Sequence, residues 1–277
     1  ISSMFKNGET GRIPIVAVTG TNGKTTTVRL ISHLLTQSGL CVGMTNTDGV
    51  YVGGRCIDTG DCSGPKSAKS VLLHPDVDAA VLETARGGVL REGLAFDRCD
   101  VAVVTNVGSG DHLGLNYITT VQDLAVLKRV IVQNVSPTGV AVLNATDPTV
   151  AAMAAKGRGS GTFFAVDKFH PGMATHRAQG QAVVYVENGH IVASKGDFQQ
   201  TMALADIPLT MGGMIPFQVE NVMASVAAAW ALGLDWDTLR QGLRTFSNDV
   251  NNAQGRFNLF KYRGATVIAD YGHNPDA

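Results

Sequence analysis

The sequence has few cysteines and no long apolar run. Its four cysteines form no C-x-x-C pair, so neither a dithiol redox motif nor a zinc knuckle is indicated, and we expect reduced thiols. No apolar run reaches the length of a membrane span, and the N-terminus lacks the charged-then-apolar order of a secretion signal. These absences predict a cytoplasmic protein without a membrane partner.

An excess of charge of one sign is also missing. The formal net charge is -1, so the chain offers no strongly basic surface to a polyanion. We therefore expect no nucleic-acid partner.

Neither end of the sequence reads like a natural terminus. The chain begins with Ile1 in a polar, glycine-containing segment and stops at Ala277, just after the strand-like run 266–270. We expect a part of a longer polypeptide in which residues 1–12 are a linker. With 277 residues and 44% hydrophobic content, this part can bury a large core in one or two domains.

The clearest motif that is present lies between an apolar run at 13–18 and a helical pattern at 28–35. Strand, glycine turn and helix together make a phosphate-binding loop: backbone N–H groups face an anion, Lys24 reaches the outer phosphates and the Thr25 hydroxyl can hold Mg²⁺. The loop departs from the pattern G-x-x-x-x-G-K-[ST], which would place glycine at Val18. We predict a nucleotide site made by Gly20, Thr21, Asn22, Gly23, Lys24, Thr25 and Thr26.

Two later apolar runs also lead to polar side chains. The run 77–82 ends on Glu83, and the run 100–106 leads to Asp111-His112 on a glycine-rich loop. Parallel strands present their carboxyl ends at one edge of a sheet, so we expect these groups near the phosphate loop. There, Glu83 can hold Mg²⁺ and His112 can act as a ligand or base. The alternatives are a turn-capping carboxylate and a structural histidine.

Apolar strands alternate with helical patterns up to about residue 160, which predicts an α/β fold with a mostly parallel, doubly wound sheet. From 160 to 210, short strand-like runs between turn residues predict a small antiparallel extension. Two helices follow, and a new strand pair begins after the polar, glycine-terminated stretch 248–256. We predict a central domain at 13–255 and, at 256–277, the truncated start of a C-terminal α/β domain.

Several motifs in this order resemble the Mur ligase family of ATP-dependent amide ligases. They are Gly20-Thr21-Asn22-Gly23-Lys24-Thr25, Glu83, Asp111-His112, Lys128, Asn144-Ala145-Thr146-Asp147-Pro148, Glu220-Asn221, Gly255-Arg256 and Asp270-Tyr271-Gly272-His273-Asn274-Pro275. Two further stretches, 60–68 and 82–91, are similar to those of family members whose Mur-like part follows an ATP-grasp part in one polypeptide. The resemblance covers nearly the whole chain.

The resemblance implies ATP and two Mg²⁺ ions as cofactors. Lys24 would bind the ATP phosphates, and Thr25 with Glu83 would hold one ion. His112 would hold the second ion together with Lys128, which many family members carry as a carbamate, a hard oxygen ligand suited to Mg²⁺. Without the resemblance, Lys128 lies beside the apolar stripe of a helix predicted at 120–135. From there it could simply extend outward to solvent.

Three further residues acquire roles from the same resemblance. Asn221 would contact adenine. Arg256 would contact the terminal phosphates and Asp270 the ribose, both from the C-terminal domain as it closes.

The implied reaction phosphorylates a carboxylate with ATP and joins it to an amine. The implied partners are arginine as the amino acid, the β-carboxylate of an aspartate in a polymer as the acceptor, the ATP-grasp part of the same polypeptide, and further copies in a homo-oligomer. Arg86 and Arg91 are candidates for holding polymer carboxylates, or are surface arginines. Because only the first strands of the family's third domain are present, the chain by itself is expected to bind nucleotide without turnover.

Other functions remain open at this point. A peptidoglycan-precursor ligase or a folylpolyglutamate synthetase would share the same ATP machinery. A P-loop kinase or GTPase is a different class, and the missing Asn-Lys-x-Asp guanine motif argues against the GTPase. A non-catalytic nucleotide-binding module is the third alternative.

Overall fold

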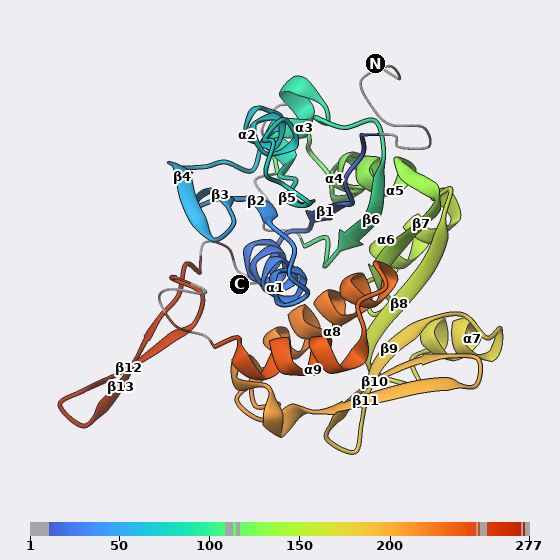
Figure 1. The fold of residues 1–277 in the computed structure, drawn as a ribbon. Helices are drawn as coiled ribbons and strands as arrows, with labels where there is room; N and C mark the ends of the chain where they lie inside the picture. The colour runs from blue at the N-terminus through green and yellow to red at the C-terminus, as the bar shows by residue number, and fades with distance from the viewer. Residues whose placement is uncertain are drawn as a thin grey trace.

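The computed structural model describes residues 11–108, 113–114, 117–247, 249, 254–272 and 274. Within these residues one sheet of 11 strands runs through the molecule in the order β11-β10-β9-β8-β7-β6-β1-β5-β2-β3-β4 (Figure 1). Its strands are β1 Ile15–Thr19, β2 Val42–Asn46, β3 Gly49–Val52, β4 Arg55–Thr59, β5 Ala79–Glu83, β6 Cys99–Val104, β7 Val135–Asn144, β8 Ser160–Asp167, β9 Val183–Glu187, β10 His190–Lys195 and β11 Phe198–Ala203.

The centre of the sheet is parallel, from β2 through β5, β1, β6, β7 and β8 to β9. The expected antiparallel extension is present as β10 and β11 beyond β9, whereas β8 and β9 continue the parallel part. On the opposite edge β2, β3 and β4 form an antiparallel meander. The predicted α/β class is confirmed.

Helices cover both faces of the sheet, which explains why its central strands are almost wholly apolar. The helices are α1 Lys24–Gln37, α2 Pro65–Leu72, α3 Arg86–Glu92, α4 Val121–Lys128, α5 Val130–Gln133, α6 Pro148–Ala151, α7 Pro171–Ala178, α8 Pro216–Ala231 and α9 Trp236–Thr245, with short 3₁₀ turns at Ala152–Lys156, Leu204–Asp206 and Pro208–Thr210. Val16 and Val18 of β1 face the core under α1, α8 and α9. Ile15 and Ala17 face the second core, under α2, α4, α5 and α6.

Local sequence signals set several of these elements. Thr120 and Asp123 form a reciprocal capping box at the start of α4, and Asp147 accepts two backbone N–H groups at the start of α6. The helix predicted at 120–135 is interrupted: α4 ends at Lys128 and α5 begins at Val130.

Beyond α9, the strands β12 Asn258–Tyr262 and β13 Ala265–Ala269 form a two-stranded hairpin that is not part of the large sheet. Figure 1 shows this hairpin projecting away from the body of the molecule. In the described residues, no helix is both long enough and apolar enough to cross a bilayer.

Candidate active site

The glycine loop lies between the end of β1 and the start of α1. Gly23 is the N-cap of α1 with a left-handed φ of 83°, a conformation that favours glycine. A Cβ at this position would also lie 2.2 Å from Oδ1 of Asn221. The N-cap Gly23 has no side chain to cap the helix, so the first backbone N–H groups of α1 can face an anion. The Lys24 ammonium donates to the Thr21 carbonyl at 2.9 Å, which holds it over the loop.

Glu83 reaches this loop from the neighbouring parallel strand, because β1 and β5 pair with Val18 opposite Glu83. The Thr25 hydroxyl donates to Glu83 Oε2 at 2.9 Å. The glutamate is only 2% exposed, and its Oε1 has no hydrogen-bond partner in the described part of the chain. Burial raises the pKa of the Glu83 carboxyl, although the Lys24 charge and the Thr25 hydroxyl oppose the shift.

An orphaned, buried carboxylate oxygen beside a hydroxyl is a donor set that fits Mg²⁺, which prefers hard oxygen ligands. Thr25 and Glu83 therefore suit the metal that the resemblance implies.

Lys128 points into the protein. Its side chain is buried, with 3% exposed, and its ammonium donates to the Gly20 carbonyl at 2.7 Å. The alternative of an outward-extending lysine is wrong, because the α4 helix directs this side chain at the phosphate loop. The other predicted member of this pair, His112, lies outside the described residues, as does Asp111.

A cavity of about 570 Å³ extends from the phosphate loop and Glu83 to the C-terminal segment. Its walls include the following predicted residues: Thr21, Asn22, Gly23, Lys24, Thr25, Thr26, Glu83, Asn221, Arg256 and Asp270. Of the remaining predicted residues, Gly20 and Lys128 meet behind the loop.

The far end of the cavity is aromatic. Phe217 of α8 and Phe257 of the C-terminal segment meet edge to face there, with ring centroids 5.5 Å apart. Asn221, one turn along α8 from Phe217, lies between these rings and Gly23 of the phosphate loop, and its amide donates to Gln218 Oε1 at 3.0 Å. Burial raises the pKa of Glu220 in the same wall, partly opposed by its hydrogen bond with Asn144.

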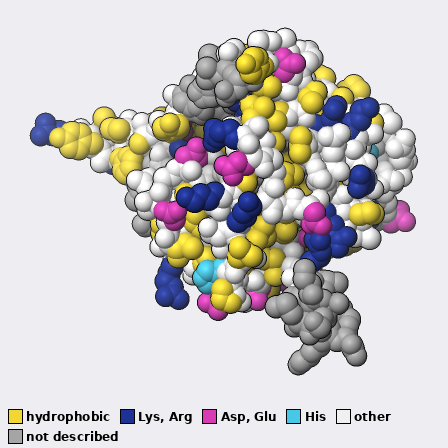
Figure 2. Space-filling model, turned by 90° about the horizontal axis from the view of Figure 1, so that it is seen from above, with side chains coloured by type: hydrophobic (Ala, Val, Ile, Leu, Met, Phe, Trp, Pro, Cys, Tyr) yellow, Lys and Arg dark blue, Asp and Glu magenta, His cyan; other side chains and the backbone are white. Residues whose placement is uncertain are grey.

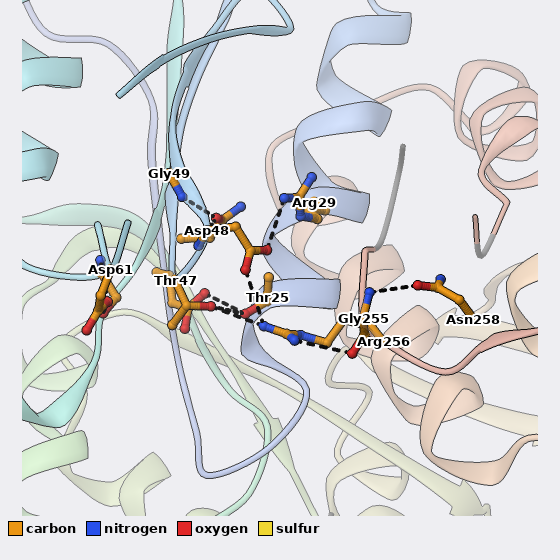
Figure 3. Close-up of polar contacts among 12 residues, drawn as sticks. Thr25, Arg29, Thr47, Asp48, Gly49, Asp61, Gly255, Arg256 and Asn258 are labelled. Atoms are coloured by element: carbon orange, nitrogen blue, oxygen red, sulfur yellow. Dashed lines mark hydrogen bonds and ion pairs between the residues drawn. The ribbon is translucent and has the colours of Figure 1, made fainter. Parts of the chain in front are cut away.

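Arg256 brings the C-terminal segment to the end of the cavity that the phosphate loop forms, called here the phosphate end. Its guanidinium donates to Thr47 Oγ1 at 3.2 Å and lies 3.7 Å from Asp48 Oδ1 (Figure 3). The same guanidinium lies over the Tyr271 ring, 5.2 Å from its centroid. The sequence patterns did not single out Thr47 and Asp48, which follow β2 in a loop rich in Gly, Asp and Thr.

The stretches 60–68 and 82–91 meet beside Glu83. The Ala85 N–H donates to the Ser63 carbonyl at 3.1 Å, and a Cβ on Gly88 would lie 2.9 Å from Gly64 Cα. Arg86 begins α3 and Arg91 lies near its exposed end. Neither arginine is among the described residues that line the large cavity.

Asn106, just past β6, is a site residue that the sequence patterns missed. Its Oδ1 accepts the backbone N–H groups of Thr21 at 3.1 Å and Asn22 at 2.8 Å, and its Nδ2 donates to the Asn22 carbonyl at 3.2 Å. Thr105 donates to the same carbonyl at 2.6 Å. A polar residue at the end of the strand beside β1 was the available signal.

We expect Asn106→Ala to weaken nucleotide binding about tenfold, because three hydrogen bonds that shape the loop are lost. The measurement is the dissociation constant of nucleotide by calorimetry, with Gln199→Ala as control, since Gln199 is an exposed amide on β11. An unchanged affinity in Asn106→Ala would show that the loop holds its shape without this side chain.

A glycine loop at a strand-to-helix junction, with a buried carboxylate on the adjacent parallel strand, defines an α/β nucleotide-binding domain of the phosphate-loop class. Residues 18–229 match the family model described as the Mur ligase middle domain. The chain belongs to the Mur ligase family.

The relatives agree with this assignment. Cyanophycin synthetase of Synechocystis sp. is 48% identical to the chain over 277 residues, which cover 99% of the chain and 32% of that protein. UDP-N-acetylmuramoyl-L-alanyl-D-glutamate--2,6-diaminopimelate ligase of Halalkalibacterium halodurans is 27% identical, over 100% of the chain and 55% of that protein. The chain thus spans about a third of the length of its cyanophycin synthetase relatives.

Solved structures show the same fold. A structure of UDP-N-acetylmuramoyl-L-alanyl-D-glutamate--2,6-diaminopimelate ligase superposes with a TM-score of 0.68 at 21% identity, covering 95% of the chain and 52% of that structure. A bifunctional folylpolyglutamate synthase/dihydrofolate synthase with Mn, AMPPNP and L-glutamate bound gives a TM-score of 0.65 at 20% identity, covering 96% of the chain and 64% of that structure.

Proposed function

We propose that the chain is the ATP-binding core of an ATP-dependent amide ligase that adds arginine to the β-carboxylate of aspartate residues in cyanophycin. The observation that carries the proposal is the single cavity shared by Lys24, the Thr25–Glu83 pair and Arg256. The 48% identity to a cyanophycin synthetase supports the choice of substrate within the family.

The proposed reaction has two steps. A carboxylate oxygen of the acceptor attacks the γ-phosphorus of ATP, the bond to the β–γ bridging oxygen breaks, and ADP leaves. The amine nitrogen of arginine then attacks the acyl carbon and loses a proton, and phosphate leaves with the electron pair of the acyl–oxygen bond. Both steps gain mainly from positioning and from charge stabilisation.

The phosphate-end residues have complementary tasks in this proposal. The N-terminus of α1 and Lys24 bind the outer phosphates, and Arg256 approaches them from the C-terminal segment. Thr25 and Glu83 would hold one Mg²⁺, which when bound neutralises charge on the transferring phosphoryl group. His112 and a carbamylated Lys128 would hold the second, and the inward position of Lys128 favours this assignment.

The aromatic part of the cavity suits a nucleobase, because flat rings pack well against aromatic side chains. We assign adenine to the space beside Asn221, Phe217 and Phe257, and the ribose to Asp270. Asn221 is buried, and its amide donates to Gln218 Oε1.

The β12–β13 hairpin supports the proposed domain boundary near residue 256. Figure 2 shows apolar side chains gathered along this projecting arm. They include Leu259, Phe260, Tyr262, Val267 and Ile268, all exposed. Such a surface is expected of the first strands of a domain whose remainder covers them.

The proposed partners are arginine, the polymer acceptor and an ATP-grasp part of the same polypeptide, within a cytoplasmic enzyme that is a homo-oligomer. A peptidoglycan-precursor or folylpolyglutamate-type ligase is the alternative, since solved structures of both kinds share this fold.

The test is phosphate release from ATP and Mg²⁺ by the full-length polypeptide. Aspartate-terminated β-Asp-Arg polymer is the acceptor, and arginine, lysine or glutamate is offered in turn. We expect release that depends on arginine and on the acceptor together. Release with another amino acid would favour the alternative ligases, and no release with any of them would favour a non-catalytic nucleotide-binding module.

A further inference from the structure

Three charged side chains from different parts of the chain form a row that leads to the phosphate-loop end of the cavity, where Arg256 is a lining residue. Arg29 of α1 donates to Asp48 Oδ2 at 3.0 Å. Asp48 Oδ1 lies 3.7 Å from the Arg256 guanidinium. Figure 3 shows Asp48 between the two arginines, with Arg256 entering from the C-terminal segment.

The backbone at Asp48 is fixed by Asn46. The backbone N–H groups of Asp48 and Gly49 both donate to Asn46 Oδ1, at 2.8 and 3.1 Å, which sets the turn between β2 and β3. A Cβ on Gly49 would lie 2.5 Å from the Asp58 carbonyl oxygen, so this turn is closely packed.

Arg29 is equally constrained. Its side chain is 9% exposed, and its guanidinium lies over the Tyr51 ring at 5.2 Å and donates to the Tyr51 hydroxyl at 3.2 Å. A buried cation needs a partner. Asp48 supplies one carboxylate oxygen to Arg29 and turns the other toward Arg256.

Arg256 is joined through Thr47 to Thr25 and Glu83. The Thr47 hydroxyl, which accepts from Arg256, lies 3.1 Å from the Thr25 hydroxyl, and Thr25 donates to Glu83. A guanidinium has five N–H donors in a planar fork, so one edge can be held by protein while another faces a phosphate.

We propose that Asp48 is a positioning residue that holds the Arg256 guanidinium at the phosphate end of the cavity and thereby docks the C-terminal segment on the phosphate loop. The proposal rests on the proposed function, because it acts through the phosphate contact of Arg256. Asp48 is not among the described residues that line the cavity: Arg29 orients its carboxylate, and the carboxylate orients Arg256.

The test is a double-mutant cycle in the full-length polypeptide with Asp48→Asn and Arg256→Gln. We expect Asp48→Asn to lower kcat/KM for ATP about five- to tenfold, since the pair is partly exposed, and Arg256→Gln to lower it about a hundredfold. In the Arg256→Gln background, Asp48→Asn should cause no further loss. Asp58→Asn, an exposed aspartate in the same meander, is the matched control and should match wild type.

Losses that multiply in the double variant would overturn the proposal, because Asp48 would then act independently of Arg256. So would an Asp48→Asn protein with a lower Tm and normal kcat/KM, which indicates a purely structural aspartate. If wild type releases no phosphate with any amino acid, the proposed function fails first. The same cycle, measured as the dissociation constant for ATP, then decides on Asp48 separately.

Discussion

Lys24→Ala is expected to reduce arginine-dependent phosphate release by about 10²–10³-fold while leaving the fold intact. Lys24 is the cation that the loop places beside the outer phosphates, and removal of one such preorganised charge costs a factor of this size. Its ammonium donates to the backbone carbonyl of Thr21 at 2.9 Å, beside the loop's N–H groups. The measurement is kcat/KM for ATP in the full-length polypeptide.

Lys195→Ala is the matched control for this variant. Lys195 is exposed at the end of β10, so its loss removes the same charge without touching the cavity. A Lys24→Ala protein with the wild-type rate would refute the assignment of this loop as the phosphate site, provided that the control is also normal.

Glu83→Gln is the second variant with a large expected effect, and it should separate activity from stability. We expect phosphate release to fall about 10²–10³-fold, because a neutral amide is a poor ligand for Mg²⁺ and leaves charge on the phosphoryl group less compensated. A calorimetric titration with Mg²⁺ in the presence of ADP should show weaker metal binding by the variant than by wild type.

Glu83→Gln should raise the free energy of unfolding although it lowers activity. Burial raises the pKa of Glu83 in the folded protein, so the ionised carboxylate disfavours the folded state above that pKa. Without metal at neutral pH, Glu83→Gln is therefore expected to raise Tm. The difference from wild type should shrink as the pH falls, because the wild-type carboxyl then becomes neutral as well.

Glu92→Gln, at the exposed end of α3, is the control for both measurements and should change neither. A Glu83→Gln protein with normal Mg²⁺ affinity would contradict the assignment of Glu83 as a ligand. A lower Tm without metal would contradict the cost assigned to burying this charge.

The predictions that succeeded depend on short-range patterns. The apolar run before Gly20 and the helical spacing after Lys24 correctly predicted β1 and α1. Asp147-Pro148 correctly predicted the start of α6. The parallel sheet followed from the alternation of such elements, and its geometry brings Glu83 to the phosphate loop by register alone.

Other features could not be read from patterns of this kind. Lys128 had two plausible directions on its helix, and the packing of α4 against the sheet selected the inward one. Asn106 carries three hydrogen bonds to the loop only because β6 lies beside β1. Phe217 of α8 contacts Phe257, the residue before β12, at a sequence separation that no periodicity describes.

The sequence by itself determined the elements, the parallel sheet and the phosphate loop, because propensity, apolar period and turn chemistry act between near neighbours. The tertiary structure alone decided which side chains surround the loop. Asp48 lies between Arg29 and Arg256 because a turn, a helix and a C-terminal segment converge. Such contacts depend on where packed elements place side chains that are far apart in the chain, and this information is spread over the whole core.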